Sequence, residues 1–295
     1  PTHIFTRLGY WQESIDLNLR SAAAAWKMPV DGKISNHYFH ALDYAVYAYL
    51  QRSQYEKAKE ISDLLDTLRG PYQPLPQIAY SLAAIPGRID LEYQKWNEAA
   101  NLSLTHPEFP WKNFPQYEAL LYYAKGIGAG RSKNIEVASL SLKKLEELQK
   151  TFRDAESNKY WIDQIEIQKK VVKAWKLYAQ NEMNESLELM TDAANLEDAT
   201  SKNPVTPGAL LPAREMLGDL YLELNRPKDA LIQYELSLKN NPNRFNTLYS
   251  AGKSAELSGD MKKAKFYYGE LLKLNKEPET TRQPIVYARN FIGNI

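Results

Sequence analysis

The chain of 295 residues carries 37 Lys and Arg against 36 Asp and Glu, which gives a formal net charge of +1. This balance argues against a nucleic-acid-binding protein, because such proteins usually present a marked cationic excess. The chain has no cysteine, which excludes disulfides and thiolate metal sites, and it has no run of about 18 apolar residues, so we expect no membrane insertion.

The first residues lack the apolar stretch of a signal peptide. The chain starts without Met and inside a helical pattern, so we expect it to be a fragment of a longer protein. The compartment is left open between cytoplasm and periplasm.

Hydrophobic periodicity and turn residues predict a chain built of helices. Asn36 is expected to cap its helix, and the helix near Pro86 is expected to break because proline removes one helical hydrogen bond. The segment 201–208, rich in Pro and Gly, is expected to form a loop inside the array. The predicted helices are 12–26, 36–51, 55–68, 116–129, 135–152, 159–180, 185–200, two pairs within 209–275, and 283–292.

The clearest signal is an internal repeat near the C-terminus. Gly218, Ala230 and Tyr234 recur 34 residues later as Gly252, Ala264 and Tyr268. A period of this length predicts helix–turn–helix units that stack on copies of themselves. Similar turns between paired helices divide the chain into repeat units. The units lie near 1–27, 36–69, 75–104, 115–152, 157–201, 209–241 and 243–275, followed by a capping helix near 282–293.

The recurring Gly, Ala and Tyr residues of this repeat, together with Leu217, Tyr221 and Pro242, resemble the tetratricopeptide repeat family. The resemblance implies an all-α fold: a right-handed α-solenoid of about seven antiparallel helix pairs, the first truncated, with a C-terminal capping helix. The segments 1–9, 40–51 and 204–215 also resemble the C-terminal part of a longer group of bacterial tetratricopeptide repeat proteins. That resemblance implies helical repeats upstream of Pro1, and it implies no activity.

Catalytic motifs are missing from the sequence. It has no Gly-x-Ser-x-Gly elbow, no glycine-rich phosphate loop and no His-Glu-x-x-His zinc motif. Gly126, Gly128 and Gly130 have the wrong spacing for a phosphate loop. The sequence therefore favours a non-enzymatic protein without a cofactor.

The first helix of each tetratricopeptide repeat lines a concave groove. The positions of that helix that face the groove, which we call the repeat register, select the candidate site residues. At the N-terminal end it brings together His3, Arg7, His40, Asp43 and Tyr47. Two imidazoles and a carboxylate could bind a divalent metal, and Arg7 could hold an anionic or peptide ligand through bidentate hydrogen bonds. The alternative is ordinary packing, with His40 hydrogen-bonded to Asp43. His37 is expected on the surface, and His106 in a loop without a role.

Further along the groove the same register selects side chains of mixed charge, then aromatic side chains, then acidic ones. Aromatic groove residues suit extended peptides. Repeats that clamp a C-terminal carboxylate carry Lys and Asn at these positions in consecutive units, and that pattern is not present here. The additional candidates are Arg88, Tyr123, Trp175, Tyr178, Glu215, Asp219, Tyr249 and Lys253.

Two hypotheses of function follow. The leading one is a non-enzymatic scaffold that binds a protein or peptide partner in the concave groove. The alternative is a small-molecule or metal site at the N-terminal end, formed by His3, Arg7, His40 and Asp43 and completed by upstream repeats. Self-association through the terminal repeats is a third possibility.

Overall fold

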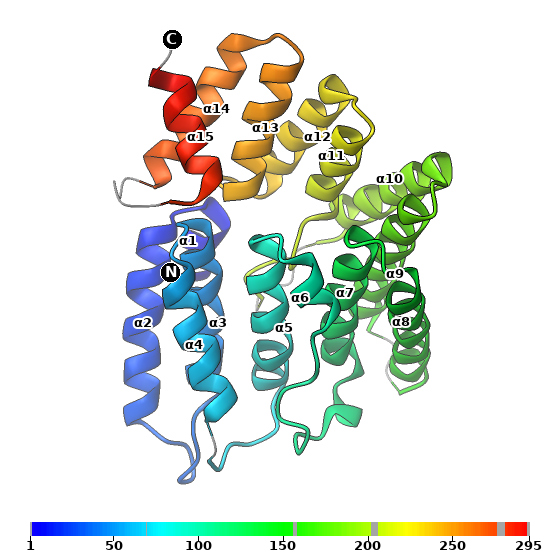
Figure 1. Ribbon diagram of the computed structural model, residues 1–295. Helices are drawn as coiled ribbons and strands as arrows, with labels where there is room; N and C mark the ends of the chain where they lie inside the picture. The colour runs from blue at the N-terminus through cyan, green and yellow to red at the C-terminus, as the bar shows by residue number, and fades with distance from the viewer. Residues whose placement is uncertain (1, 69, 156–157, 202–205, 276–280, 294–295) are drawn as a thin grey trace.

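The computed structural model describes residues 2–68, 70–155, 158–201, 206–275 and 281–293, and over these residues the elements are helices (Figure 1). The predicted all-α solenoid is confirmed. Pro1 and Pro204, which enter the resemblances above, lie outside the described residues, as do positions 202–205 of the predicted loop. The helices are α1 (Thr2–Leu8), α2 (Trp11–Lys27), α3 (Asn36–Gln51), α4 (Tyr55–Thr67), α5 (Pro76–Glu92), α6 (Trp96–Ala100), the 3-10 helix η1 (Trp111–Asn113), α7 (Pro115–Arg131), α8 (Ile135–Ala155), α9 (Lys159–Ala179), α10 (Met183–Ala199), α11 (Ala213–Glu223), α12 (Pro227–Asn240), α13 (Phe245–Leu257), α14 (Met261–Leu274) and α15 (Gln283–Gly293).

Consecutive helices pack in pairs from α1 with α2 to α13 with α14, and α15 packs on α14. The first helices of four successive pairs, α3, α5, α7 and α9, also contact one another in sequence. We call these four helices the inner row. They are the helices on which the sequence places the groove-facing side chains of the second to fifth units.

The 34-residue period has a direct packing reason. A Cβ atom added at Gly218 would lie 2.6 Å from the ring of Tyr234, and one added at Gly252 would lie 2.6 Å from the ring of Tyr268. Both tyrosines are fully buried. Each glycine therefore lets the ring of the paired helix lie directly against the helix backbone, which is the close approach that stacking requires.

Two local predictions are wrong. Helix α5 runs unbroken through Pro86, because it packs between α3 and α7 and Gly87 allows the backbone to approach Ala124 closely. The packing on both sides outweighs the loss of one hydrogen bond. The cap of α3 is Ser35 rather than Asn36, because the Ser35 side chain accepts a hydrogen bond from the amide of His37.

The end of the solenoid packs on its beginning, as Figure 1 shows for α13 and α15 above α1 to α3. The Trp11 indole donates to the carbonyl of Asn243 at 2.6 Å, and the backbone amide of Phe245 donates to the side chain of Gln51 at 2.8 Å. Most buried apolar residues form one large core, and a second core lies in the last repeats. Within the described residues, no helix has the length and apolar character needed to cross a membrane.

Candidate functional site

A non-helical stretch between α10 and α11, Thr206–Pro212, lies against the inner row, and we call it the crossing segment. Its main-chain carbonyls accept hydrogen bonds from side chains of α5 and α7. The hydroxyl of Tyr80 donates to Gly208 at 3.1 Å, Arg88 donates to Ala209 at 2.9 Å, and Tyr123 donates to Leu211 at 3.4 Å. Arg88 and Tyr123, two predicted groove residues, therefore hold a peptide backbone, and that backbone belongs to the chain itself.

The crossing segment is firmly anchored. Leu210 and Leu211 are 1% and 3% exposed, and full burial of each leucine stabilises the folded state by about 1.5–3 kcal/mol. The segment is therefore a fixed wall, and it turns one side of the inner row into a cavity.

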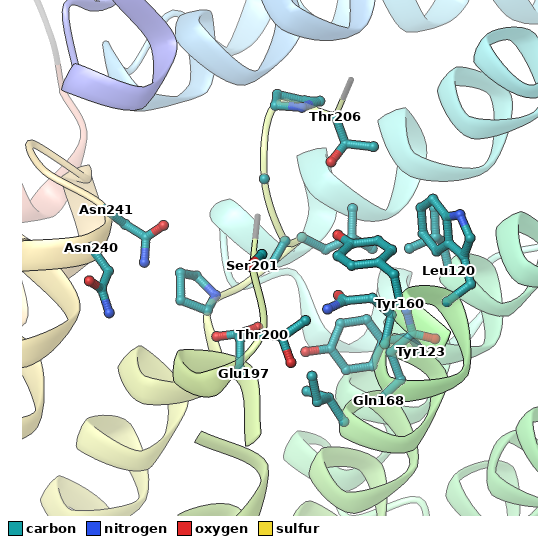
Figure 2. A pocket seen from close by; sticks show the side chains of 18 of the residues that line it. Leu120, Tyr123, Tyr160, Gln168, Glu197, Thr200, Ser201, Thr206, Asn240 and Asn241 are labelled. Atoms are coloured by element: carbon teal, nitrogen blue, oxygen red, sulfur yellow. The ribbon is translucent and has the colours of Figure 1, made fainter. Parts of the chain in front are cut away.

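This cavity, which we call the large cavity, has a volume of about 250 Å³. Its walls come from the crossing segment, from the first half of α9, and from the ends of α10 and α12. Figure 2 shows Asn240 and Asn241 across the cavity from Tyr123 and Tyr160. The lining combines aromatic rings with amide side chains, among them those of Gln164, Gln168, Asn240 and Asn241.

Gln168 is the most informative residue of the lining. Its side chain is 5% exposed, and its Oε1 atom accepts no hydrogen bond. A buried acceptor without a donor costs about 1–3 kcal/mol. The Gln168 residue also lines the large cavity.

The N-terminal cluster forms only in part. The Nε2 atoms of His3 and His40 lie 3.0 Å apart, and the ring of His3 stacks on Tyr44 at 4.7 Å. Burial lowers the pKa of His40 to about 4, with further contributions from His3 and His37. Its imidazole is therefore neutral at pH 7.

Asp43 does not join the two histidines. It is fully buried, and neither of its carboxylate oxygens accepts a hydrogen bond, so the predicted bond from His40 is wrong. Burial raises the pKa of Asp43 to about 6, against the opposing charge of Arg88. Among the described residues no three His, Cys, Asp or Glu side chains are placed to hold a metal ion, which removes the main support for a metal site at His3, His40 and Asp43.

Two guanidinium groups lie close to Tyr47. The carbon at the centre of Arg88 lies 4.5 Å from the ring centroid and that of Arg244 lies 5.7 Å from it, while Arg244 donates to the Tyr47 hydroxyl at 2.8 Å. Arg244 is also paired with the buried Glu215 and with Glu92, both at 2.8 Å. The prediction that Asp43, Tyr47, Arg88 and Glu215 face an open groove is wrong, because the crossing segment and the last repeats cover them.

The remaining candidates also have partners inside the protein. Trp175 is 1% exposed, with the guanidinium of Arg131 4.4 Å from its ring, and Tyr178 donates to Glu223. Asp219 accepts a hydrogen bond from Tyr234 at 2.6 Å. Lys253 donates to the hydroxyl of Tyr287 at 2.8 Å, and the same ring packs against Tyr249. Of the predicted site residues, Arg7 and Tyr123 line the large cavity. The predictions of ligand contact, at these two positions and at the others, stay predictions.

Sequence reasoning missed the half of α9 that lines the large cavity. Trp161, Gln164 and Gln168 are spaced i, i+3 and i+7, which places them on one face of a helix. That spacing could have revealed the face. The repeat register selected Trp175 and Tyr178 instead, which lie in the second half of the same helix.

His106 also differs from its prediction. It is 2% exposed and its Nε2 atom contacts the carbonyl of Leu65 at 2.8 Å, so the connector before α7 is anchored to the end of α4. His37 is exposed, as predicted. The three glycines of α7 are packing residues, because a Cβ atom at Gly126, Gly128 or Gly130 would lie within 2.6 Å of a neighbouring helix.

Comparisons with known proteins agree with the repeat in the C-terminal region. No curated protein matches the chain. Residues 211–244 and 245–278 each match the tetratricopeptide repeat family. These two matched stretches correspond to the pairs α11/α12 and α13/α14. A solved structure, the apo form of RapI, aligns over 99% of this chain and 84% of its own chain, with 12% identity and a TM-score of 0.42.

Proposed function

We propose that this protein is a non-enzymatic interaction scaffold that binds a short extended segment of a partner protein in the large cavity. The observation that carries the proposal is the crossing segment. Side chains of the inner row already bind the carbonyls of one peptide backbone, at Gly208, Ala209 and Leu211. The large cavity extends this surface beside the crossing segment, with space for a second, shorter stretch of chain.

The lining of the large cavity suits a peptide backbone. An amide side chain both donates and accepts hydrogen bonds, as the peptide group does, and four amide side chains line this cavity. The rings of Tyr80, Tyr123, Tyr160 and Trp161 add apolar surface for partner side chains. Protein interaction is also the general role of tetratricopeptide repeats.

The test is selection of peptides from a displayed random library on the purified full chain, followed by titration calorimetry. We expect Gln168→Ala to weaken the selected peptides about tenfold, because one hydrogen bond in a buried site is lost. Gln180→Ala is the matched control, since Gln180 follows the end of α9 and its side chain is exposed. Tyr160→Ala provides a second, half-buried position on the cavity wall.

Either of two results would overturn the proposal. One is a selection that yields no peptide with affinity above background. The other is a set of peptides that bind the wild-type chain, Gln168→Ala and Tyr160→Ala equally well, because such peptides would bind elsewhere.

A further inference from the structure

The end of α2 and the connector to α3, residues 26–33, expose large apolar side chains, and we call this stretch the tip. Trp26, Met28 and Val30 are 52%, 72% and 52% exposed. Single exposed apolar residues are ordinary on a protein surface, but here three of them lie within five residues. Clustered apolar side chains in solvent mark a surface that interacts with another molecule.

The tip has a defined shape although it projects into solvent. Val30 and Lys33 exchange two backbone hydrogen bonds of 2.9 Å each around a two-residue turn. Asp31 and Gly32 occupy this turn with φ angles of 52° and 70°, which a hairpin turn of this type requires. A loop that is already ordered loses little conformational entropy when it binds. The tip is therefore suited to enter a matching groove.

A groove of about 360 Å³ opens beside the tip, between the connector that follows α4 and the connector before α7. We call it the connector groove. Its apolar walls include Tyr72, Pro74, Phe109 and Pro110. Glu108 also lines it, with a side chain that is 57% exposed. The connector groove thus combines an apolar surface with a carboxylate that is open to solvent.

The tip and the connector groove are fixed relative to one another. Ile34, which follows the tip, donates from its amide to the carbonyl of Pro71 at 2.9 Å. The hydroxyl of Tyr72 lies 3.3 Å from Nδ1 of His106, whose Nε2 atom contacts the carbonyl of Leu65. The three connectors therefore lie side by side, at the lower end of α2 to α5 in Figure 1.

Charge and apolar surface favour a second copy of this chain as the occupant of the connector groove. The tip carries the exposed cation of Lys27 beside its apolar side chains. The connector groove carries Glu108 beside its apolar walls. The two surfaces are therefore complementary in charge and alike in apolar character. Because they lie side by side, one two-fold axis can set each tip against the groove of the other copy.

We propose that two copies of this chain form a two-fold symmetric dimer through the tip and the connector groove. Trp26 and Met28 of each copy enter the connector groove of the other, and Lys27 pairs with Glu108 across the interface. Each of these contacts occurs twice in the dimer. The tip and the connector groove share no residue with the large cavity, so this inference does not depend on the proposed peptide site.

Sedimentation velocity of the full chain over a range of concentrations gives the dissociation constant of the dimer. Met28→Ser is expected to weaken the dimer about a hundredfold, because a buried apolar side chain is lost from both contacts. Met261→Ser is the matched control, since Met261 on α14 is 51% exposed. A wild-type chain that stays monomeric up to its solubility limit would overturn the proposal. Equal dissociation constants for the wild type and Met28→Ser would also overturn it.

Exchange of the two charges tests how the copies pair. Lys27→Glu or Glu108→Lys alone sets like charges together at both contacts, so each variant should weaken the dimer about a hundredfold. In an equal mixture the two variants can pair with each other, and both contacts then join opposite charges again. We therefore expect the mixture to dimerise with about the affinity of the wild type. Lys228→Glu, at an exposed position on α12, is the matched control.

Two outcomes of the charge exchange would overturn the proposal. One is a mixture that dimerises no better than either variant alone, because a reciprocal contact between Lys27 and Glu108 requires recovery. The other is equal weakening by Lys228→Glu and Lys27→Glu, because the effect would then follow from net charge. Far-UV circular dichroism verifies that every variant is folded, as expected for substitutions at exposed positions.

Discussion

Arg244 is the residue whose removal should most disturb the junction between the first and last repeats. Its side chain is fully buried, forms ion pairs with Glu92 and Glu215 at 2.8 Å each, and donates to the hydroxyl of Tyr47. Arg244→Met keeps much of the aliphatic packing and removes the charge. Two buried carboxylates would then lose their main cation, and breaking a buried pair in this way costs about 3–5 kcal/mol.

The destabilisation should depend on pH, and its direction follows from the pKa of Glu92. Burial raises this pKa above its ordinary value, and the charge of Arg244 opposes the shift. Without Arg244 the pKa rises further, so the native state of the variant favours the protonated carboxyl. A group with a raised native pKa contributes stability at low pH that is lost as pH rises through the native pKa. The difference between variant and wild type is therefore expected to be smaller at pH 5 than at pH 8.

Urea denaturation of the full chain, followed by far-UV circular dichroism, measures the effect at both pH values. Arg226→Met is the matched control, because Arg226 pairs with Asp229 on the exposed surface, and loss of such a pair costs about 0–1 kcal/mol. The reasoning is refuted if Arg244→Met lies within about 1 kcal/mol of the wild type. It is also refuted if the loss of stability is the same at pH 5 and pH 8.

The other predictions also concern stability. Burial raises the native pKa of Asp43 to about 6, so the stability that this carboxyl contributes is lost as pH rises through that value. Relative to the wild type, Asp43→Asn should therefore be more stable at pH 8 than at pH 4, by up to about 3 kcal/mol. If the carboxylate were solvated, melting curves would show the same difference between variant and wild type at both pH values. Gly218→Ala should cost about 1–3 kcal/mol of folding stability, because the new methyl group meets the ring of Tyr234. Gly269→Ala, where the new methyl group meets nothing, should stabilise the chain by up to about 1 kcal/mol. Equal effects of the two variants in urea denaturation would contradict the packing argument. Ala264→Leu, at a fully buried contact, should cost about 1–3 kcal/mol in the same assay, and a neutral result would mean that the helix contact is not close. Gln168→Leu should raise the melting temperature, because it removes a buried acceptor that has no donor; a lower melting temperature would indicate that this oxygen is satisfied.

Sequence reasoning was accurate where a local pattern has a local physical cause. The recurrence of Gly218 and Tyr234 as Gly252 and Tyr268 predicted two stacked helix pairs, and each glycine meets its tyrosine within one pair. Most predicted helices end within a few residues of the observed ones, because amphipathic spacing and turn residues act over short distances. Pro86 was one exception, since its effect on the backbone is decided by packing against α3 and α7.

The candidate site depended on contacts that no local pattern contains. The repeat register placed Arg88 and Tyr123 on the inner face of the helices, and both do face a peptide backbone. The register could not show that this backbone is the crossing segment of the same chain. It also treated every unit as part of an open groove, whereas Arg244 closes the last repeats onto Tyr47 of the second pair.

The sequence by itself determined the helical repeat and the residues that make its helices pack, because spacing along one helix dictates which side chains share a face. The tertiary structure alone decided which of those faces are covered, since this depends on segments more than 100 residues apart meeting at Arg88 and Arg244. It also decided where space is left, in the large cavity lined by Gln168. A cavity is a property of several helices together, and no single stretch of sequence encodes it.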